Sequence, residues 1–145
     1  KLKTAYSGES KLDQPFKIVP VKGKQKKVGT SYQNLAEVKE IKRLVEELTQ
    51  TYQDIVVIAP YSAQVALLKK HIPDVAVHTV DSFQGREADV VILTTVRVGK
   101  TVGFWSDYRR LNVGLTRAKH GLRVVGDVDT WKNSDSPLKK MAELL

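Results

Sequence analysis

Residues 55–72 read IVVIAPYSAQVALLKKHI, and this stretch decides the fold class. Its first five residues are apolar and mostly β-branched, and a proline ends the run. Such an unbroken run is typical of a strand that is buried on both faces, as in a parallel sheet. Ser62 follows as a candidate helix N-cap, and Val65, Leu68 and Ile72 then recur at helical spacing. The stretch therefore predicts a strand, a turn and a helix in succession.

The same succession continues on both sides of this stretch. Apolar patterns predict further strands at residues 16–21, 75–80, 89–96 and 122–125, and further helices at residues 34–50, 108–119 and 138–145. Asn34 is a candidate N-cap for the first helix, and Glu37 is placed to reach back to it as in a capping box. Strands that alternate with helices form βαβ units, so we predict an α/β fold with a parallel sheet of about five strands flanked by helices.

The composition excludes several classes of protein. Of 145 residues, 41% are hydrophobic and 28% are charged, which argues against a disordered tail or a collagen-like repeat. No run approaches the roughly 20 apolar residues of a membrane span, so no membrane partner is expected. The lack of cysteine excludes disulfides and thiolate metal sites and fits an intracellular chain, and the three histidines have no metal-ligand spacing. Because the chain starts at Lys1 without a targeting segment, we expect a piece of a longer protein.

The formal net charge of +8 is concentrated in two blocks. Residues 1–27 carry eight basic and two acidic side chains, and residues 97–123 carry seven basic and one acidic. Two basic blocks predict a polyanionic partner, either nucleic acid or nucleotide phosphate. For the lysines of the first block, a solvated surface is an equal alternative; these lysines are Lys22, Lys24, Lys26 and Lys27.

Candidate site residues follow the predicted strands, where ligands of parallel sheets bind. They include Pro60 and Tyr61, the loop TVDSFQGRE at residues 79–87, and Arg97. The hydroxyls and amides of the loop are suited to phosphate or ribose, and Gly85 lets the backbone approach a ligand or adopt a positive φ. The alternative is a polar loop with a turn glycine.

Residues 107–119 read DYRRLNVGLTRAK and are predicted as a helix that ends at Lys119. On such a helix Leu111, Leu115 and Ala118 share one face, which would pack on the sheet. Arg110 and Arg117 are seven residues apart, so they would project together from one flank. Because like charges repel, a shared anion such as a triphosphate would stabilise this pair. The alternative is a solvated basic helix.

Three segments in order carry a resemblance to a known family. They are IAPYSAQ at residues 58–64, VDSFQGRE at residues 80–87 and GFWSDYRRLNVGLTRAK at residues 103–119, and GTSYQN at residues 29–34 adds to them. With these segments the chain resembles the second RecA-like domain of superfamily 1 helicases of the up-frameshift and senataxin-like type. The first three look like helicase motifs IV, V and VI. The resemblance implies a RecA-like, P-loop NTPase type fold over residues 16–145, with residues 1–15 as a linker.

The resemblance also implies roles in ATP hydrolysis. ATP with Mg²⁺ would be held mainly by a first RecA-like domain upstream in the same polypeptide. Arg117 looks like the arginine finger of motif VI, and Arg110 is assigned phosphate or interdomain contacts. The loop expected to face the nucleotide comprises Gln84, Gly85, Arg86 and Glu87. Because the chain has no Gly-x-x-x-x-Gly-Lys-Ser/Thr loop, we expect the isolated domain to be inactive.

The nucleic-acid contacts implied by the resemblance lie elsewhere. Pro60, Tyr61 and Thr79 match positions that meet the backbone of single-stranded RNA or DNA. The chain departs from the family at Leu35, where some members carry an arginine, and at Gly114, where alanine is common.

Two other functions remain open from the sequence. One is a catalytically inert module that binds single-stranded nucleic acid or a protein partner, and the other is a flavodoxin-like regulatory domain. Phe104 and Trp105 are candidates either for stacking on a base or for packing a loop.

Overall fold

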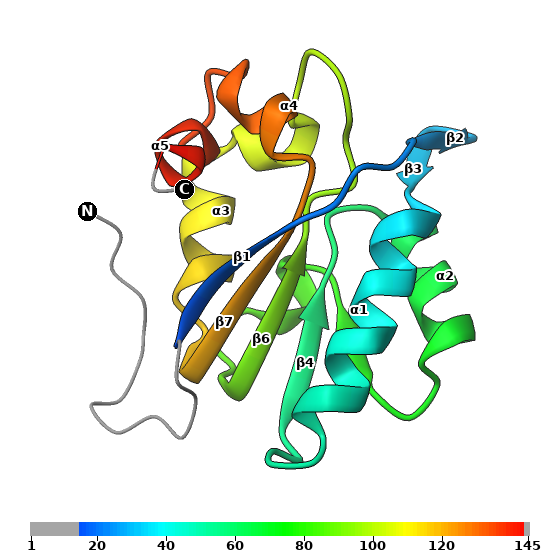
Figure 1. Ribbon diagram of the computed structural model, residues 1–145, viewed down its shortest axis with the longest axis vertical. Helices are drawn as coiled ribbons and strands as arrows, with labels where there is room; N and C mark the ends of the chain where they lie inside the picture. The colour runs from blue at the N-terminus through cyan, green and yellow to red at the C-terminus, as the bar shows by residue number, and fades with distance from the viewer. Residues whose placement is uncertain (1–14, 144–145) are drawn as a thin grey trace.

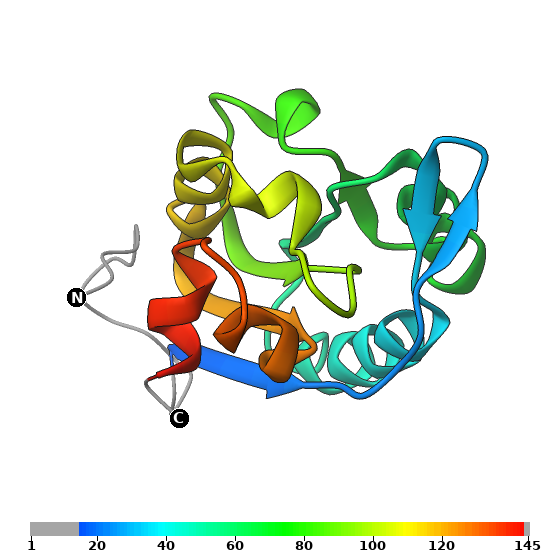
Figure 2. The same ribbon diagram turned by 90° about the horizontal axis from the view of Figure 1, so that it is seen from above.

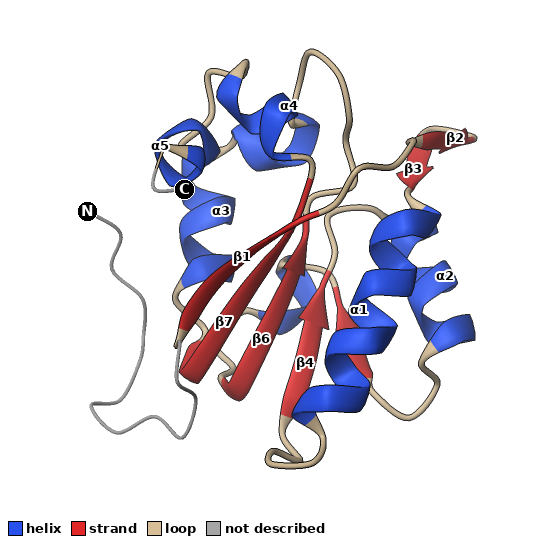
Figure 3. Ribbon diagram, in the orientation of Figure 1, coloured by secondary structure: helices blue, strands red, loops and turns tan. Residues whose placement is uncertain are grey.

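The computed structural model describes residues 15–143, and its centre is a five-stranded sheet in the order β1-β7-β6-β4-β5 (Figure 1 and Figure 3). The strands are β1 (Phe16–Pro20), β4 (Ile55–Ile58), β5 (Ala76–His78), β6 (Ala88–Thr94) and β7 (Ala118–Gly126). Every neighbouring pair is parallel. The predicted α/β class with a parallel sheet is confirmed.

Helices cover both faces of this sheet, as the view from above shows (Figure 2). On one face lie α1 (Leu35–Leu48) and α2 (Ser62–His71), and on the other lie α3 (Tyr108–Leu115) and α5 (Leu138–Ala142). Val90 and Ile92 of β6 pack toward α1, whereas Val91 and Leu93 pack toward α3. This coverage explains why the central strands read as unbroken apolar runs.

The remaining described elements are short. They are the two-stranded antiparallel sheet of β2 (Lys26–Val28) and β3 (Ser31–Gln33), the helix α4 (Val128–Lys132), and the 3₁₀ turns η1 (Asp81–Phe83) and η2 (Gly103–Ser106). The final helix was predicted through residue 145, and residues 144–145 lie outside the described part, as does nearly all of the predicted linker at residues 1–15. No helix within residues 15–143 is long and apolar enough to cross a membrane.

The helix predicted over residues 108–119 is wrong at its carboxyl end. α3 ends at Leu115, and the Thr116 hydroxyl donates to the carbonyl of Asn112 at 2.8 Å. The chain then enters β7, because the carbonyl of Arg117 accepts a hydrogen bond from the backbone N–H of Ala88 at 3.1 Å. Arg117 is therefore not on the helix, and it does not project from a shared flank with Arg110 as predicted.

The helix starts are confirmed in part. Asn34 caps α1, since its Oδ1 accepts from the backbone N–H of Glu37 at 3.2 Å. The predicted cap at Ser62 is wrong, because Ser62 lies within the first turn of α2. The hydroxyl of Ser31, on the unpredicted strand β3, accepts instead from the N–H of Ala63 at 3.0 Å.

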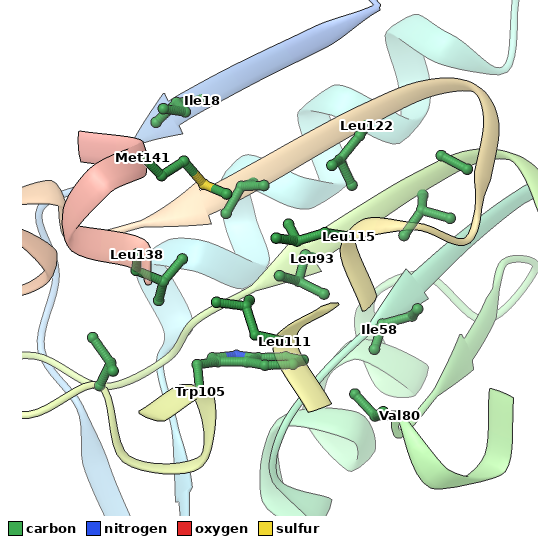
Figure 4. Close-up of a cluster of buried hydrophobic side chains, with 14 of the residues drawn as sticks. Ile18, Ile58, Val80, Leu93, Trp105, Leu111, Leu115, Leu122, Leu138 and Met141 are labelled. Atoms are coloured by element: carbon green, nitrogen blue, oxygen red, sulfur yellow. The ribbon is translucent and has the colours of Figure 1, made fainter. Parts of the chain in front are cut away.

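Gly114 allows α3 to pack closely against the sheet. A Cβ atom at this position would lie 2.8 Å from Cδ1 of Leu93 and 3.5 Å from the ring of Trp105. Trp105 itself is fully buried in this cluster (Figure 4), and its Nε1 donates to the carbonyl of Thr94 at 3.1 Å. Trp105 is thus a core residue, and its alternative role in base stacking is ruled out.

Candidate nucleotide and nucleic-acid interfaces

The predicted site residues divide between the two ends of the parallel sheet. Tyr61 and Thr79 follow β4 and β5 at the end that we call the carboxyl edge. Glu87 and Arg117 immediately precede β6 and β7 at the opposite end, the amino edge, where Ala88 pairs with Ala118. The fold therefore separates the residues predicted to contact nucleic acid from the arginine predicted to contact phosphate.

Tyr61 is the centre of a polar and aromatic cluster at the carboxyl edge. Its hydroxyl accepts from the backbone N–H of Phe104 at 3.0 Å and from Nη1 of Arg97 at 3.3 Å. Its ring makes edge contacts with Tyr32 and Phe104, at centroid distances of 5.3 and 6.4 Å. Gly103 fits here only without a side chain, since its Cβ would lie 2.1 Å from the Tyr61 hydroxyl and its φ is +56°.

Two arginines lie over the aromatic rings of this cluster. The guanidinium carbon of Arg97 is 4.0 Å from the centroid of Tyr32, and that of Arg110 is 4.7 Å from the centroid of Phe104. These distances are those of cation–π pairs. Arg110 therefore belongs with the carboxyl-edge cluster rather than with Arg117. We call Tyr32, Tyr61, Arg97, Phe104 and Arg110 the arginine–aromatic surface.

The other two residues predicted to bind nucleic acid, Pro60 and Thr79, are already packed or hydrogen-bonded within the fold. Pro60 is buried at the end of β4, next to Ala59, whose N–H donates to the carbonyl of His78 at 2.9 Å. Thr79 is half-buried, and its hydroxyl accepts from the N–H of Ser82 at 3.2 Å, at the start of η1. Of the three residues, Tyr61 alone is part of the arginine–aromatic surface.

A buried carboxylate lies beneath the chain that carries Arg97. Oε1 of Glu37 accepts from the Thr94 hydroxyl at 2.6 Å and from the N–H groups of Thr95 and Val96 at 3.1 and 3.0 Å. Glu37 also reaches back to Asn34 as predicted, but its Oε2 accepts from the side-chain Nδ2 of Asn34 at 3.1 Å, while the backbone N–H of Asn34 donates to Gln64, so the capping box is not complete. Burial raises the pKa of the Glu37 carboxyl to about 7, although the three hydrogen bonds oppose that rise.

This carboxylate holds a strained residue. Val96 has a φ of +66°, a conformation that β-branched residues rarely adopt. Glu37 accepts its N–H, and Nδ2 of Asn34 donates to its carbonyl at 3.0 Å. The strained turn fixes the direction in which the next residue, Arg97, leaves β6.

Gln64 completes the buried network and was not identified from the sequence. Its Oε1 accepts from the N–H of Asn34 at 2.8 Å, and its Nε2 donates to the Thr94 hydroxyl at 3.2 Å. The available signal was its position four residues before Leu68, which places a polar amide on the buried face of α2. The network therefore links α1, α2 and β6 beneath the arginine–aromatic surface.

The amino edge presents an incompletely paired arginine. Arg117 is half-buried, and its Nε is a buried donor without a hydrogen-bond partner among the described residues. Its Nη2 donates to the Thr116 hydroxyl at 3.3 Å. A buried guanidinium donor without an acceptor is costly, so this geometry suits an anionic ligand supplied from outside the domain.

The loop that precedes β6 lies exposed. Its four predicted nucleotide contacts are Gln84, Gly85, Arg86 and Glu87, all of them exposed. Gly85 has a φ of +78°, as the sequence allowed.

Next to this loop, burial and the charge of Arg86 lower the pKa of the His78 side chain. Within residues 15–143 there is no group of three acidic or histidine side chains that could hold a metal ion.

Comparisons with known proteins match this chain to a family. The family model described as an AAA domain, AAA_12, matches residues 3–129. An uncharacterized ATP-dependent helicase of Methanocaldococcus jannaschii is 38% identical over 124 residues, which cover 81% of this chain and 19% of that protein. The helicase sen1 of Schizosaccharomyces pombe is 34% identical over 138 residues, covering 83% of this chain and 8% of that protein.

A third relative and a solved structure agree with this. The regulator of nonsense transcripts 1 homolog of Neurospora crassa is 39% identical over 115 residues, covering 68% of this chain and 10% of that protein. The chain thus spans 8–19% of the length of these relatives. The C-terminal domain of a possible DNA helicase from Lactobacillus plantarum has the same fold, with a TM-score of 0.57, 16% identity, and coverage of 86% of this chain and 77% of that one.

Proposed function

Because the chain belongs to the AAA_12 family of AAA domains, among superfamily 1 helicases of the up-frameshift and senataxin-like type, we propose that it is the second RecA-like domain of an ATP-dependent helicase. In this proposal, residues 16–145 form the domain. An upstream RecA-like domain of the same polypeptide holds most of the nucleotide. Single-stranded RNA or DNA is the second partner, and the location is intracellular, where both ligands occur.

The observation that carries the proposal is the buried Nε of Arg117, which has no hydrogen-bond partner within residues 15–143. It lies where the family resemblance expects an arginine finger. When bound, ATP with Mg²⁺ supplies the phosphoryl group and the metal, and the chain's own sequence has no phosphate-binding loop for them. The role proposed for Arg117 is to stabilise negative charge on the phosphates, and a guanidinium is suited to this.

The exposed loop before β6 is proposed to act beside Arg117. Glu87 precedes Ala88, whose N–H bonds the carbonyl of Arg117, so the two side chains start from neighbouring strand ends. Gln84, Gly85 and Arg86 complete this part of the proposed nucleotide contact. Arg110 is assigned to nucleic acid instead, because it lies against Phe104.

The arginine–aromatic surface is the proposed contact for a single strand. Aromatic rings and guanidinium planes stack on bases without regard to sequence. Tyr61 is proposed as the direct contact. Pro60 and Thr79 are proposed to shape the backbone at the ends of β4 and β5, because the first is buried and the hydroxyl of the second is already bonded.

The test is the ATPase rate of the full-length native polypeptide that contains this chain, measured with and without single-stranded RNA or DNA. We compare Arg117→Ala with Arg109→Ala, which removes an equally charged but exposed side chain from α3. Strand-stimulated turnover that falls by about 10³-fold or more in Arg117→Ala and little in Arg109→Ala supports the proposal. Equal turnover in the two variants removes Arg117 from this role.

The alternative is a catalytically inert module that binds single strands, and the arginine–aromatic surface would serve it equally well. This alternative predicts strand binding by a full-length protein that hydrolyses no ATP. The same experiment therefore decides between the two functions.

A further inference from the structure

The hairpin of β2 and β3 presents lysines that the proposed function has not yet used. Lys24, Lys26 and Lys27 are exposed, and the hairpin projects beyond the sheet beside the start of α1 (Figure 1). We call these three residues the hairpin lysines. The sequence from residue 15 to residue 36 contains no acidic residue that could neutralise them locally.

These lysines are also without ion pairs to the rest of the described chain. Lys22, just before the hairpin, is paired with Asp127 at 3.7 Å and with Asp129. In contrast, none of the hairpin lysines lies within ion-pair distance of an acidic side chain in residues 15–143. The hairpin is therefore a locally uncompensated cationic surface, which favours an anionic partner.

The hairpin is held against the arginine–aromatic surface by specific contacts. Oε1 of Gln25 accepts from Nε of Arg97 at 3.1 Å and from the N–H of Val98 at 2.8 Å. Tyr32 of β3 lies under the guanidinium of Arg97. The hairpin is thus a fixed extension of that surface.

The register of the hairpin places one lysine next to the aromatic ring. Lys27 is the cross-strand partner of Tyr32. Residues directly opposite each other on two antiparallel strands project from the same face, with Cβ atoms about 5 Å apart. A nucleic-acid strand that places a base against the face containing Tyr32 would therefore bring its phosphates to Lys27.

We propose that Lys27, with the exposed Lys24 and Lys26 adding to the positive potential around it, binds the phosphodiester backbone of the same single strand whose bases stack on the arginine–aromatic surface. This inference rests on the proposed function and extends the contact beyond the residues that the family resemblance supplies. A single strand is favoured over a protein partner because lysine is depleted at the cores of protein interfaces, and Val28 is the one large apolar side chain exposed on the hairpin.

The test is the salt dependence of strand binding by the full 145-residue chain, followed by fluorescence anisotropy. Each phosphate contact on a single strand contributes about 0.7 to the slope of log affinity against log salt. Replacing Lys24, Lys26 and Lys27 together by glutamine should therefore reduce the slope by about 0.7 for the contact at Lys27, and by up to about 2 where all three lysines contact phosphate. The control replaces Lys39, Lys42 and Lys70, which are exposed on α1 and α2, by glutamine and removes the same charge.

Two probe lengths sharpen the result. With a nucleic-acid strand of about 16 nucleotides, the slope should fall in the hairpin variant and stay near the native value in the control. With a strand of about 4 nucleotides, the two variants should have the same slope. Equal slopes with the longer strand overturn the inference while leaving the proposed function intact. A reduced slope for duplex but not for single-stranded probes also overturns it. If the unmodified chain binds no strand at all, the proposed nucleic-acid function itself fails.

Discussion

The two edges of the sheet differ in how completely their polar groups are paired. At the carboxyl edge, Arg97 and Tyr61 are bonded to one another and supported from below by the buried network around Glu37. At the amino edge, Arg117 retains a buried donor without an acceptor among the described residues, beside an exposed loop. The comparison shows that one surface is held together by hydrogen bonds among the described residues, whereas the other retains a donor for which residues 15–143 offer no acceptor.

The largest expected effect is that of a substitution at the amino edge, which should change ATP turnover without changing nucleic-acid binding. In the full-length protein, Arg117→Ala should reduce strand-stimulated ATPase turnover by about 10³-fold or more, because the guanidinium would stabilise charge on the transferring phosphoryl group. Strand affinity, measured by anisotropy without nucleotide, should be unchanged. A parallel loss of strand affinity would show that the edges do not act separately.

The next effect concerns the support of the carboxyl edge and depends on pH. Burial raises the pKa of the Glu37 carboxyl from 4.5 to about 7, so between these values the folded chain binds more protons than the unfolded chain. Its contribution to stability is complete below pH 4.5 and is lost as the pH rises to about 7, with a slope of up to about 1.4 kcal/mol per pH unit.

Urea denaturation of native chain and Glu37→Gln across this pH range measures that slope. The glutamine variant should have a flatter profile, since it has no carboxyl at this position. Two parallel profiles would exclude a Glu37 that titrates near neutrality. Lower strand affinity in Glu37→Gln, with Arg117-dependent turnover retained, would confirm that the network supports the carboxyl edge alone.

A smaller effect is expected within the arginine–aromatic surface. Tyr61→Ala should weaken single-strand binding by about ten-fold, because one base would lose a stacking partner worth about 1–3 kcal/mol. Tyr61→Phe retains the ring and removes the oxygen that accepts from Phe104 and Arg97. It should therefore reduce the free energy of single-strand binding by less, about 1 kcal/mol. Equal losses in the two variants, compared by anisotropy, would assign the effect to the hydroxyl rather than the ring.

The smallest effect tests the element that joins the edges. Gly114→Ala would place a methyl group 2.8 Å from Leu93 Cδ1, while gaining about 1 kcal/mol of helix propensity. We expect the free energy of unfolding, measured by thermal denaturation, to fall by about 1 kcal/mol. Because α3 carries Arg110 at one end and leads to Arg117 at the other, strand binding and turnover should shift together. An effect on one of them alone would contradict that role for α3.

The central fold was predictable because its signals are local and strong. The apolar runs at residues 55–59 and 90–93 require burial on both faces, which leaves a covered parallel sheet as the natural solution. The end of α3 was not predictable in this way. Ala118 is buried at a spacing that also suits a helix, and pairing with Ala88 decides that it belongs to β7.

The site was predictable where residues follow strands, as Tyr61 and Arg97 do. The hairpin of β2 and β3 has no apolar alternation, because β2 is exposed and all three residues of β3 are half-buried, so the sequence contained no signal for it. Glu37 matched a local capping pattern and does contact Asn34, but the three partners of its Oε1 lie 57 to 59 residues away. Contacts of this range depend on the assembled sheet and could not be derived from spacing.

Gly103 has a consequence for how this surface can change in evolution. The space that its missing Cβ would occupy is filled by the Tyr61 hydroxyl, and its positive φ disfavours other residues. While position 61 is tyrosine, position 103 is closed to substitution, and a shorter side chain at 61 would lift only part of the steric restriction, because Nη1 of Arg97 would lie 2.7 Å from the same Cβ. The two positions, 42 residues apart in sequence, should therefore covary among related sequences, and an alignment would reveal them as a coupled pair.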